Sequence, residues 1–158
     1  MDKNVHSESE FNSLLTEWRE AGAKLVFTNG CFDLLHPGHV QYLSDAKALG
    51  DKLIIGVNSD LSVQNLKGPN RPINSLKDRL IMLNHLSSTD LLVSFNEDTP
   101  INLIKFIKPD ILVKGGDYTF DSIVGAKFTK ERGGQVIVLP FLKGYSSTKI
   151  INQIKKLS

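Results

Sequence analysis

The chain has 158 residues, with 19 Lys and Arg against 17 Asp and Glu, so its formal net charge is only +2. Apolar residues make up 41% and charged residues 23%, a composition typical of globular proteins that excludes an intrinsically disordered chain. The near balance of charge argues against a dedicated nucleic-acid binder, which usually carries a basic stripe. The one cysteine, Cys31, excludes an intrachain disulfide and a cysteine-rich zinc module.

The sequence contains no targeting or membrane segment that we could identify. Residues 1–6 are polar and of mixed charge, without the apolar core of a signal peptide. The longest apolar stretches, residues 53–57 and 136–142, are far too short to span a bilayer. We therefore expect a cytoplasmic protein with a reduced Cys31 and with neither a membrane nor a nucleic acid as its partner.

Two kinds of hydrophobic spacing alternate along the chain. Apolar residues at helical spacing in residues 11–18, before Gly22, predict a helix within residues 1–22. Short apolar runs predict strands at residues 24–29, 52–57, 91–95, 111–114 and 135–139. Helices are predicted at about residues 38–48, at 60–66, at 75–86, from Thr99-Pro100 to Pro109, at 121–132 as a weaker segment, and at about 149–156.

Short apolar strands that alternate with helices favour a Rossmann-like, doubly wound α/β fold with a parallel five-stranded sheet. Residues 1–158 show no internal repeat or linker, so we expect a single domain. In such a sheet, ligands bind beyond the carboxyl ends of the strands, near the point where the strand order reverses. The loops that follow the predicted strands are therefore the places to look for a site.

The segment after the first predicted strand, residues 28–39, is rich in groups that bind phosphate. Gly30 permits a tight backbone turn, and Gly38 removes side-chain bulk where a helix begins. His36 and His39 lie three residues apart, so both can face one ligand at a helix N-terminus whose free amides favour anions. A capped helix with two surface histidines is the plainer interpretation, but the position directly after the first strand favours a phosphate site.

Residues 36–39, HPGH, resemble the H-x-G-H motif of the cytidylyltransferase-like nucleotidyltransferases, and residues 28–33 are similar to the strand end before that motif. Residues 144–151, GYSSTKII, are similar to the family's second signature, S-[ST]-T-x-[IL]. The resemblance covers residues 24 to 158, so residues 23–158 are expected to form a catalytic core behind the first helix. The branch of the family that transfers an adenylyl group to a heptose 1-phosphate is most similar at residues 57–60, 67–72, 97–100 and 113–118.

This resemblance implies an enzyme that joins ATP to D-glycero-β-D-manno-heptose 1-phosphate, giving ADP-heptose and pyrophosphate in lipopolysaccharide precursor synthesis. The attacking phosphate oxygen is already an anion, so positioning and charge neutralisation are required rather than a strong base. Mg²⁺ is expected to arrive with ATP, without a metal site built by the protein. The resemblance also allows a homodimer, and a separate heptose kinase of the same pathway as a partner.

The resemblance assigns His36 and His39 to the nucleotide phosphates, with Lys67 on a closing loop and Arg79 on the helix behind it also reaching the phosphates. Taken alone, Lys67 is equally well interpreted as a solvated surface charge. The residues assigned to the sugar phosphate are Asp33, Asn58 and Arg71. The residues assigned to the nucleotide are Thr28, Asn29, Gly30, Cys31, Phe32, Gly38, Lys114, Gly115, Asp117, Ser146, Ser147 and Thr148.

Two other functions stay open at this point. A cytidylyltransferase acting on glycerol 3-phosphate or a related alcohol phosphate would share the phosphate-binding motifs and differ in its nucleotide preference. A nucleotide-binding module that has lost catalysis would keep the fold, although no expected phosphate-binding residue is missing. A thiol nucleophile at Cys31 is not expected, because nucleotidyl transfer to a phosphate has no use for a thiolate and free cysteines are mostly inert.

Overall fold

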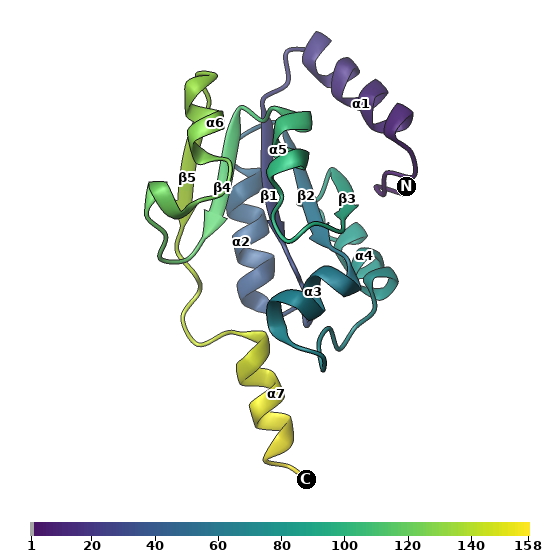
Figure 1. Ribbon diagram of the computed structural model, residues 1–158, viewed down its shortest axis with the longest axis vertical. Coiled ribbons are helices and arrows are strands. Elements are labelled where there is room, and N and C mark those ends of the chain that lie inside the picture. Colours follow the sequence, from purple (N-terminus) through teal and green to yellow (C-terminus); the bar gives the residue numbers. More distant parts are fainter. Residues whose placement is uncertain (1) are drawn as a thin grey trace.

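The computed structural model describes residues 2–158, which form one five-stranded sheet with helices on both faces (Figure 1). All neighbouring strands are parallel, and their order across the sheet is β3-β2-β1-β4-β5. The order reverses between β1 and β4, because the chain adds strands first on one side of β1 and then on the other. The doubly wound parallel sheet predicted from the sequence is therefore confirmed.

The strands begin and end within one residue of their predicted bounds. They are β1 (Leu25–Gly30), β2 (Lys52–Asn58), β3 (Leu91–Phe95), β4 (Ile111–Gly115) and β5 (Gln135–Leu139). In the central strand β1, Phe27 pairs with Ile54 of β2 and with Leu112 of β4. The central strands are almost continuously apolar because helices cover both of their faces.

The helices are α1 (Glu8–Glu20), α2 (Pro37–Lys47), α3 (Asp60–Lys67), α4 (Leu76–Asn84), α5 (Ile101–Ile107), α6 (Ala126–Glu131) and α7 (Ser147–Lys155), with a 3₁₀ turn η1 (Phe120–Ser122). Several begin with a side chain that accepts a hydrogen bond from the amide three residues further on, which satisfies a free helix-start donor. These capping residues are Ser7, His36, Ser59, Ser75 and Ser146.

Two helix predictions were wrong in detail. Residues 121–132 do not form one helix, because Gly125 has a φ of +83° and separates η1 from α6. At the start of α5, Pro100 rather than Thr99 takes the N-cap position, and no side chain caps this helix. The carbonyl of Pro100 accepts from the Ile104 amide at 2.9 Å, and its ring nitrogen carries no hydrogen that would need an acceptor.

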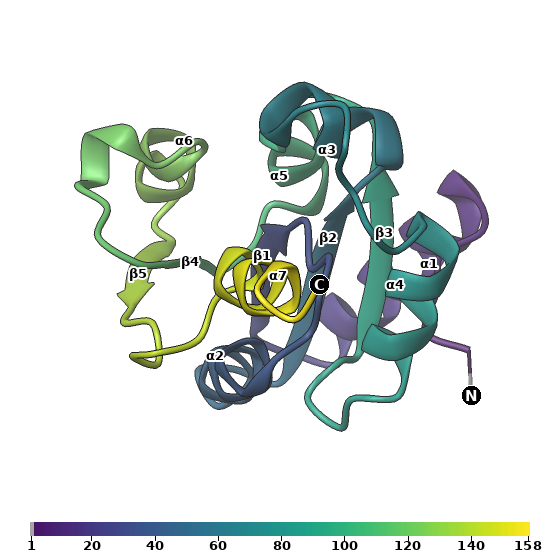
Figure 2. The ribbon, with the colours of Figure 1, turned by 90° about the horizontal axis from the view of Figure 1, so that it is seen from below.

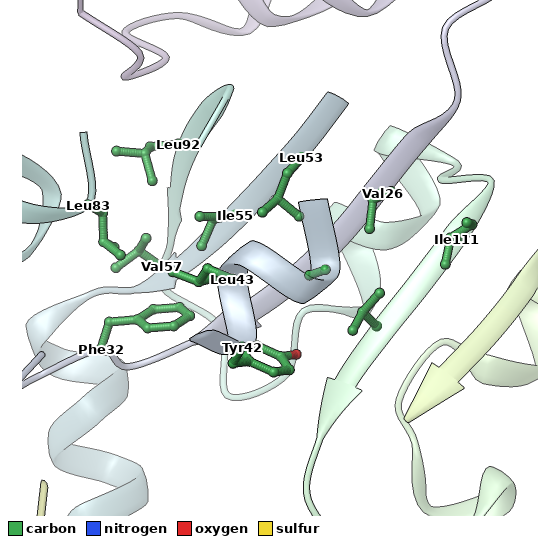
Figure 3. Close-up of a cluster of buried hydrophobic side chains, with 12 residues drawn as sticks. Val26, Phe32, Tyr42, Leu43, Leu53, Ile55, Val57, Leu83, Leu92 and Ile111 are labelled. Atoms are coloured by element: carbon green, nitrogen blue, oxygen red, sulfur yellow. The ribbon is translucent and has the colours of Figure 1, made fainter. Parts of the chain in front are cut away.

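Each face of the sheet has its own apolar core. On one face, α2 and α4 pack on side chains such as Val26 and Ile55 (Figure 3). On the other face, α1, α5 and α6 cover Leu25, Phe27 and Ile54. Neighbouring residues of one strand therefore enter different cores, as expected for alternating side chains in a sheet that is covered on both sides.

Helix α7 projects beyond the carboxyl ends of the strands (Figure 1), and seen from below it stands in front of β1 (Figure 2). None of its residues, all of which the structure describes, is buried. It begins at Ser147, two residues before the predicted start, because Ser146 caps it. Among residues 2–158, no helix is both long enough and apolar enough to cross a membrane.

Candidate active site

A cavity of about 590 Å³ opens at the carboxyl ends of β1, β2 and β4, where the strand order reverses. Its walls come from the loop after β1, the first turn of α2, the end of α3, the segment after β4 and the start of α7. The volume is ordinary for a small-molecule site. The location is the ligand crevice that the sheet topology predicts.

His36 and His39 occupy the first turn of α2, and their rings stack with centroids 3.8 Å apart. His36 caps the helix, and its Nδ1 accepts a hydrogen bond from the His39 amide at 3.3 Å. The Nδ1 of His39 is buried and has no hydrogen-bond partner among the described residues. The ring of His39 lines the cavity, so His39 presents to a ligand the accessible part of its imidazole and not this buried nitrogen.

The two imidazoles are poor bases in the ligand-free protein. Burial, followed by the nearby charges of His36 and Lys67, lowers the pKa of His39 to about 4. Burial also lowers the pKa of His36. Both rings are therefore neutral near neutral pH, and an anion entering the cavity would favour their protonated forms.

The start of α7 lines the same cavity. Ser146 caps α7 by accepting from the Lys149 amide at 3.0 Å, and the Ser147 hydroxyl donates to the Leu34 carbonyl at 3.1 Å. The ring of Tyr145 lies parallel to that of His36, with centroids 6.2 Å apart. Two helix N-termini, those of α2 and α7, thus open onto one cavity, an arrangement that favours a polyanion.

Positive charge exceeds negative charge in the lining of the cavity. Lys67 ends α3 and is exposed, whereas Lys114 in β4 is half-buried, with its ammonium 5.5 Å from the centroid of the Tyr118 ring. Burial lowers the pKa of Lys114. Among the lining residues in the described chain, Asp98 is the one carboxylate. The electrostatics of the lining therefore suit an anionic ligand.

Most of the predicted site residues line this cavity. They are Asn29, Gly30, Cys31, Phe32, His36, Gly38, His39, Asn58, Lys67, Lys114, Gly115, Ser146, Ser147 and Thr148. The remaining predicted residues lie outside the lining. They are Thr28, Asp33, Arg71, Arg79 and Asp117.

Arg79 does not face the cavity, contrary to our expectation that it reaches phosphates. Its side chain is 0% exposed. The guanidinium donates to the carbonyls of Cys31 at 2.6 Å, Asn58 at 2.8 Å and Asn74 at 3.2 Å, and it pairs with Asp60 at 2.9 Å. All these bonds are internal, so the geometry makes Arg79 a support for the loops around the cavity.

Asp33 and Arg71, both predicted to contact the sugar phosphate, contact each other instead. The Arg71 Nε donates to the Asp33 carboxylate at 2.6 Å, and the amides of Ile73 and Asn74 donate to it at 2.8 Å. Burial would raise the pKa of Asp33, but the two amides and Arg71 outweigh it and lower that pKa. The carboxylate therefore fastens residues 71–74 to the loop after β1.

Three residues that were assigned to the nucleotide, Thr28, Asp117 and Cys31, have surroundings that need separate description. Thr28 is buried in β1, and its hydroxyl lies 2.6 Å from that of Tyr42, a cavity-lining residue of α2. Asp117 is exposed after β4. Burial raises the pKa of the Cys31 thiol, so Cys31 lines the cavity in its neutral form.

Sequence reasoning missed much of the lining. The missed residues are Tyr42, Leu66, Asp98, Thr99, Pro100, Leu112, Tyr118, Ser122, Ile123, Val124, Phe141, Leu142 and Tyr145. Most are apolar or aromatic, and such residues are ordinarily interpreted as core. One usable signal was present: the apolar run 136–142 continues past the end of β5, which places Phe141 and Leu142 in a loop at the ligand-binding edge.

Comparison with known proteins shows which family the chain belongs to. Residues 27–153 match the family model described as cytidylyltransferase-like. The chain is 51% identical over 154 residues to the bifunctional protein HldE of Nitrosococcus oceani, and 52% identical over 153 residues to that of Haemophilus influenzae. These alignments cover 98% and 97% of this chain but 33% and 32% of the relatives, so the chain spans about a third of their length.

Two solved structures are also similar in fold to this chain. The lipopolysaccharide core biosynthesis protein of Thermoplasma volcanium has a TM-score of 0.63 and 31% identity, covering 79% of this chain and 100% of its own. The pantoate-beta-alanine ligase of Francisella tularensis, solved with beta-gamma ATP and beta-alanine, has a TM-score of 0.64 over 99% of this chain and 78% of its own. At 17% identity, that second likeness concerns the fold alone. By its motifs, its cavity and the family model over residues 27–153, the chain belongs to the cytidylyltransferase-like family of nucleotidyltransferases.

Proposed function

We propose that the chain is an adenylyltransferase that joins ATP to D-glycero-β-D-manno-heptose 1-phosphate, giving ADP-heptose and pyrophosphate. The observation that carries the proposal is the stacked, neutral pair His36 and His39, which shares one cavity with the start of α7. The motif stretches at residues 67–72 and 113–118 support the heptose branch. The likeness to a lipopolysaccharide core biosynthesis protein supports its place in that pathway.

The site's residues suit the chemistry of this transfer. A bond forms between the sugar-phosphate oxygen and the α-phosphorus of ATP, and the bond to the β-phosphate breaks, so negative charge moves onto pyrophosphate. His39 and His36, which both line the cavity, would contact the phosphate chain and gain positive character as it enters. The Thr148 hydroxyl and the free amides at Ser147 and Thr148 would hold the departing pyrophosphate, while the Ser147 hydroxyl keeps its bond to the Leu34 carbonyl.

Mg²⁺ bound to the triphosphate would supply further neutralisation of its charge. Among residues 2–158, no group of three or more His, Cys, Asp or Glu side chains is arranged to hold a metal ion. Asp98 is the one carboxylate among the described lining residues. Such a donor set suits a cation that takes most of its ligands from ATP and water, which is the usual coordination of Mg²⁺ at nucleotide sites.

The substrates are tested by measuring pyrophosphate release with Mg²⁺, crossing ATP and CTP with heptose 1-phosphate and glycerol 3-phosphate. We expect release only with ATP and heptose 1-phosphate. Release with CTP and glycerol 3-phosphate would keep the site and replace the substrates. The absence of pyrophosphate release in all four combinations would contradict the proposed reaction.

The histidine site is tested by His39→Ala in the same assay. We expect the rate to fall by roughly 10²- to 10⁴-fold, as is typical when a positioned catalytic group is removed. Circular dichroism should be unchanged, because the ring lies at the cavity rather than inside the apolar core. His85→Ala is the matched control, since His85 is exposed at the end of α4 outside the cavity, and its rate should equal the wild-type rate. A His39→Ala variant as fast as wild type would refute this assignment. A wild type that releases no pyrophosphate, with a His39→Ala variant that only binds ATP less tightly, would indicate a non-catalytic module.

A further inference from the structure

The cavity is lined unevenly. The part formed by α2, α3 and α7 carries His36, His39, Lys67 and the serine hydroxyls that open α7. The part formed by β4, the segment that follows it and the segment after β5 is mainly apolar, and its polar lining residues are Lys114, Ser122 and Tyr118 with its hydroxyl. The apolar residues of that part include Leu112, Ile123, Val124, Phe141 and Leu142. A ligand that matches both parts therefore has an anionic portion and an apolar portion.

Phe141 is fixed at the apolar end by two glycines. A Cβ atom at Gly116 would lie 2.5 Å from Phe141 Cε2, and one at Gly115 would lie 2.7 Å from Phe141 Cε1. Carbon atoms cannot approach so closely, so the ring occupies space that only glycine leaves open. Gly116 also has a φ of +102°, a conformation that disfavours other residues. The end of β4 therefore positions the outer edge of this ring.

The same ring remains largely uncovered. Phe141 is 65% exposed although it lines the cavity, and it lies two residues after the end of β5. A large apolar side chain gains free energy when a ligand covers it, in proportion to the apolar area removed from water. A ring that is held in place and yet open to the cavity is suited to stacking on a planar group of the ligand.

We propose that Phe141 is the platform on which the nucleobase of the nucleotide substrate stacks, while the phosphate chain reaches the histidines and the start of α7. The inference rests on the proposed function, because it names the residue that would recognise the adenine of ATP. A two-ring purine covers more of a phenylalanine ring than a one-ring pyrimidine does. The platform therefore favours ATP over CTP.

The experiment measures nucleotide binding in the absence of the sugar phosphate, so that no turnover occurs. Isothermal titration calorimetry compares ATP, CTP and inorganic tripolyphosphate, each with Mg²⁺, on wild type and on Phe141→Ala. We expect the variant to bind ATP roughly 10- to 100-fold more weakly, the usual consequence of removing an aromatic side chain from under a base. Its affinity for tripolyphosphate, which has no base, should not change.

Two further variants keep the test specific. Phe120→Ala removes another exposed phenylalanine near the end of β4, one that does not line the cavity, and it should bind all three ligands like wild type. Phe141→Leu keeps an apolar side chain without an aromatic face and should lose nearly as much ATP affinity as Phe141→Ala. Because Phe141 is mostly exposed, neither of its variants should change the thermal midpoint of unfolding greatly.

The outcomes separate this inference from the proposed function. Wild-type ATP affinity in Phe141→Ala would overturn the platform, as would an equal loss of ATP and tripolyphosphate affinity, which would indicate a disturbed cavity. CTP binding as tight as ATP binding in wild type would contradict the purine preference. A chain that binds ATP through Phe141 yet releases no pyrophosphate with heptose 1-phosphate would refute the proposed reaction and leave the platform standing.

Discussion

Two helices begin at the candidate active site, and they are attached to the rest of the protein in opposite ways. Helix α2 buries Tyr42, Leu43 and Ala46 in the core, whereas α7 buries none of its described residues. A hydrogen bond from the Ser147 hydroxyl to the Leu34 carbonyl ties the start of α7 to the loop before α2. One half of the phosphate site is therefore built into the core, and we expect the other half to be ordered mainly by the ligand.

The half at α2 is supported by two buried charged groups. Arg79 holds two loop carbonyls and the carbonyl at the end of β2, and Asp33 holds residues 71–74 against the loop that leads to His36. A buried charge is favourable only when its hydrogen bonds are well made, so these groups fix one arrangement of the loops. The half at α7 has no comparable group among the described residues.

Replacing Arg79 by Met should have the largest effect on stability, because it breaks the support of the α2 half. Three carbonyls at the edge of the core would lose their donors, and Asp60 would lose its partner. We expect the free energy of unfolding, measured with urea, to fall by about 3 kcal/mol. Lys77→Met, at an exposed position of the same helix, should change it by less than about 0.5 kcal/mol. If Arg79→Met lost activity but kept its stability, Arg79 would act on the phosphates directly.

Hydrogen exchange measures the contrast between the two helices directly. Amides of α7 should open with a free energy about 2 kcal/mol lower than amides of α2, since few packed side chains resist the opening of α7. Adding ATP with Mg²⁺ should slow exchange in α7 more than in α2. Equal protection of both helices in the free protein would refute the idea that the core orders the α2 half whereas the ligand orders the α7 half.

The parts of this arrangement that could be predicted are those encoded by neighbouring residues. The strands are short apolar runs, and His36 and His39 are three residues apart in the sequence. The bonds of Arg79 could not be predicted, because two of its acceptor carbonyls lie 48 and 21 residues away and meet it only once the sheet has formed. Hydrophobic spacing likewise says nothing about the left-handed φ of Gly125, which interrupts the helix predicted for residues 121–132.

The cavity lining shows the same limit of sequence reasoning. Phe141 belongs to an apolar run that looks like a strand, and its position at the cavity follows from the pairing of β5 with β4. Gly115 was assigned to the nucleotide, and in the structure it lines the cavity and, together with Gly116, also makes room for the Phe141 ring. The family resemblance was enough to predict most of the phosphate-binding residues. The apolar residues of the lining could be identified only from the structure.

The smallest expected effect concerns the acid stability of the α2 half. Burial, then the charges of His36 and Lys67, lowers the pKa of His39 to about 4, whereas a histidine in an unfolded chain has a pKa near 6.5. Between these values the unfolded chain binds more protons than the folded one. Stability is therefore highest above about pH 6.5 and is lost as the pH falls toward about 4.

We expect wild type to lose about 1 kcal/mol more stability than His39→Ala between about pH 7 and about pH 4.5, a value reduced because the ring is only partly buried. Urea unfolding of both proteins at the two pH values gives this difference. Equal losses would mean that folding does not depress the pKa of His39. In that case the partly buried ring of His39 would be solvated well enough to take up a proton in the folded protein as readily as in the unfolded chain.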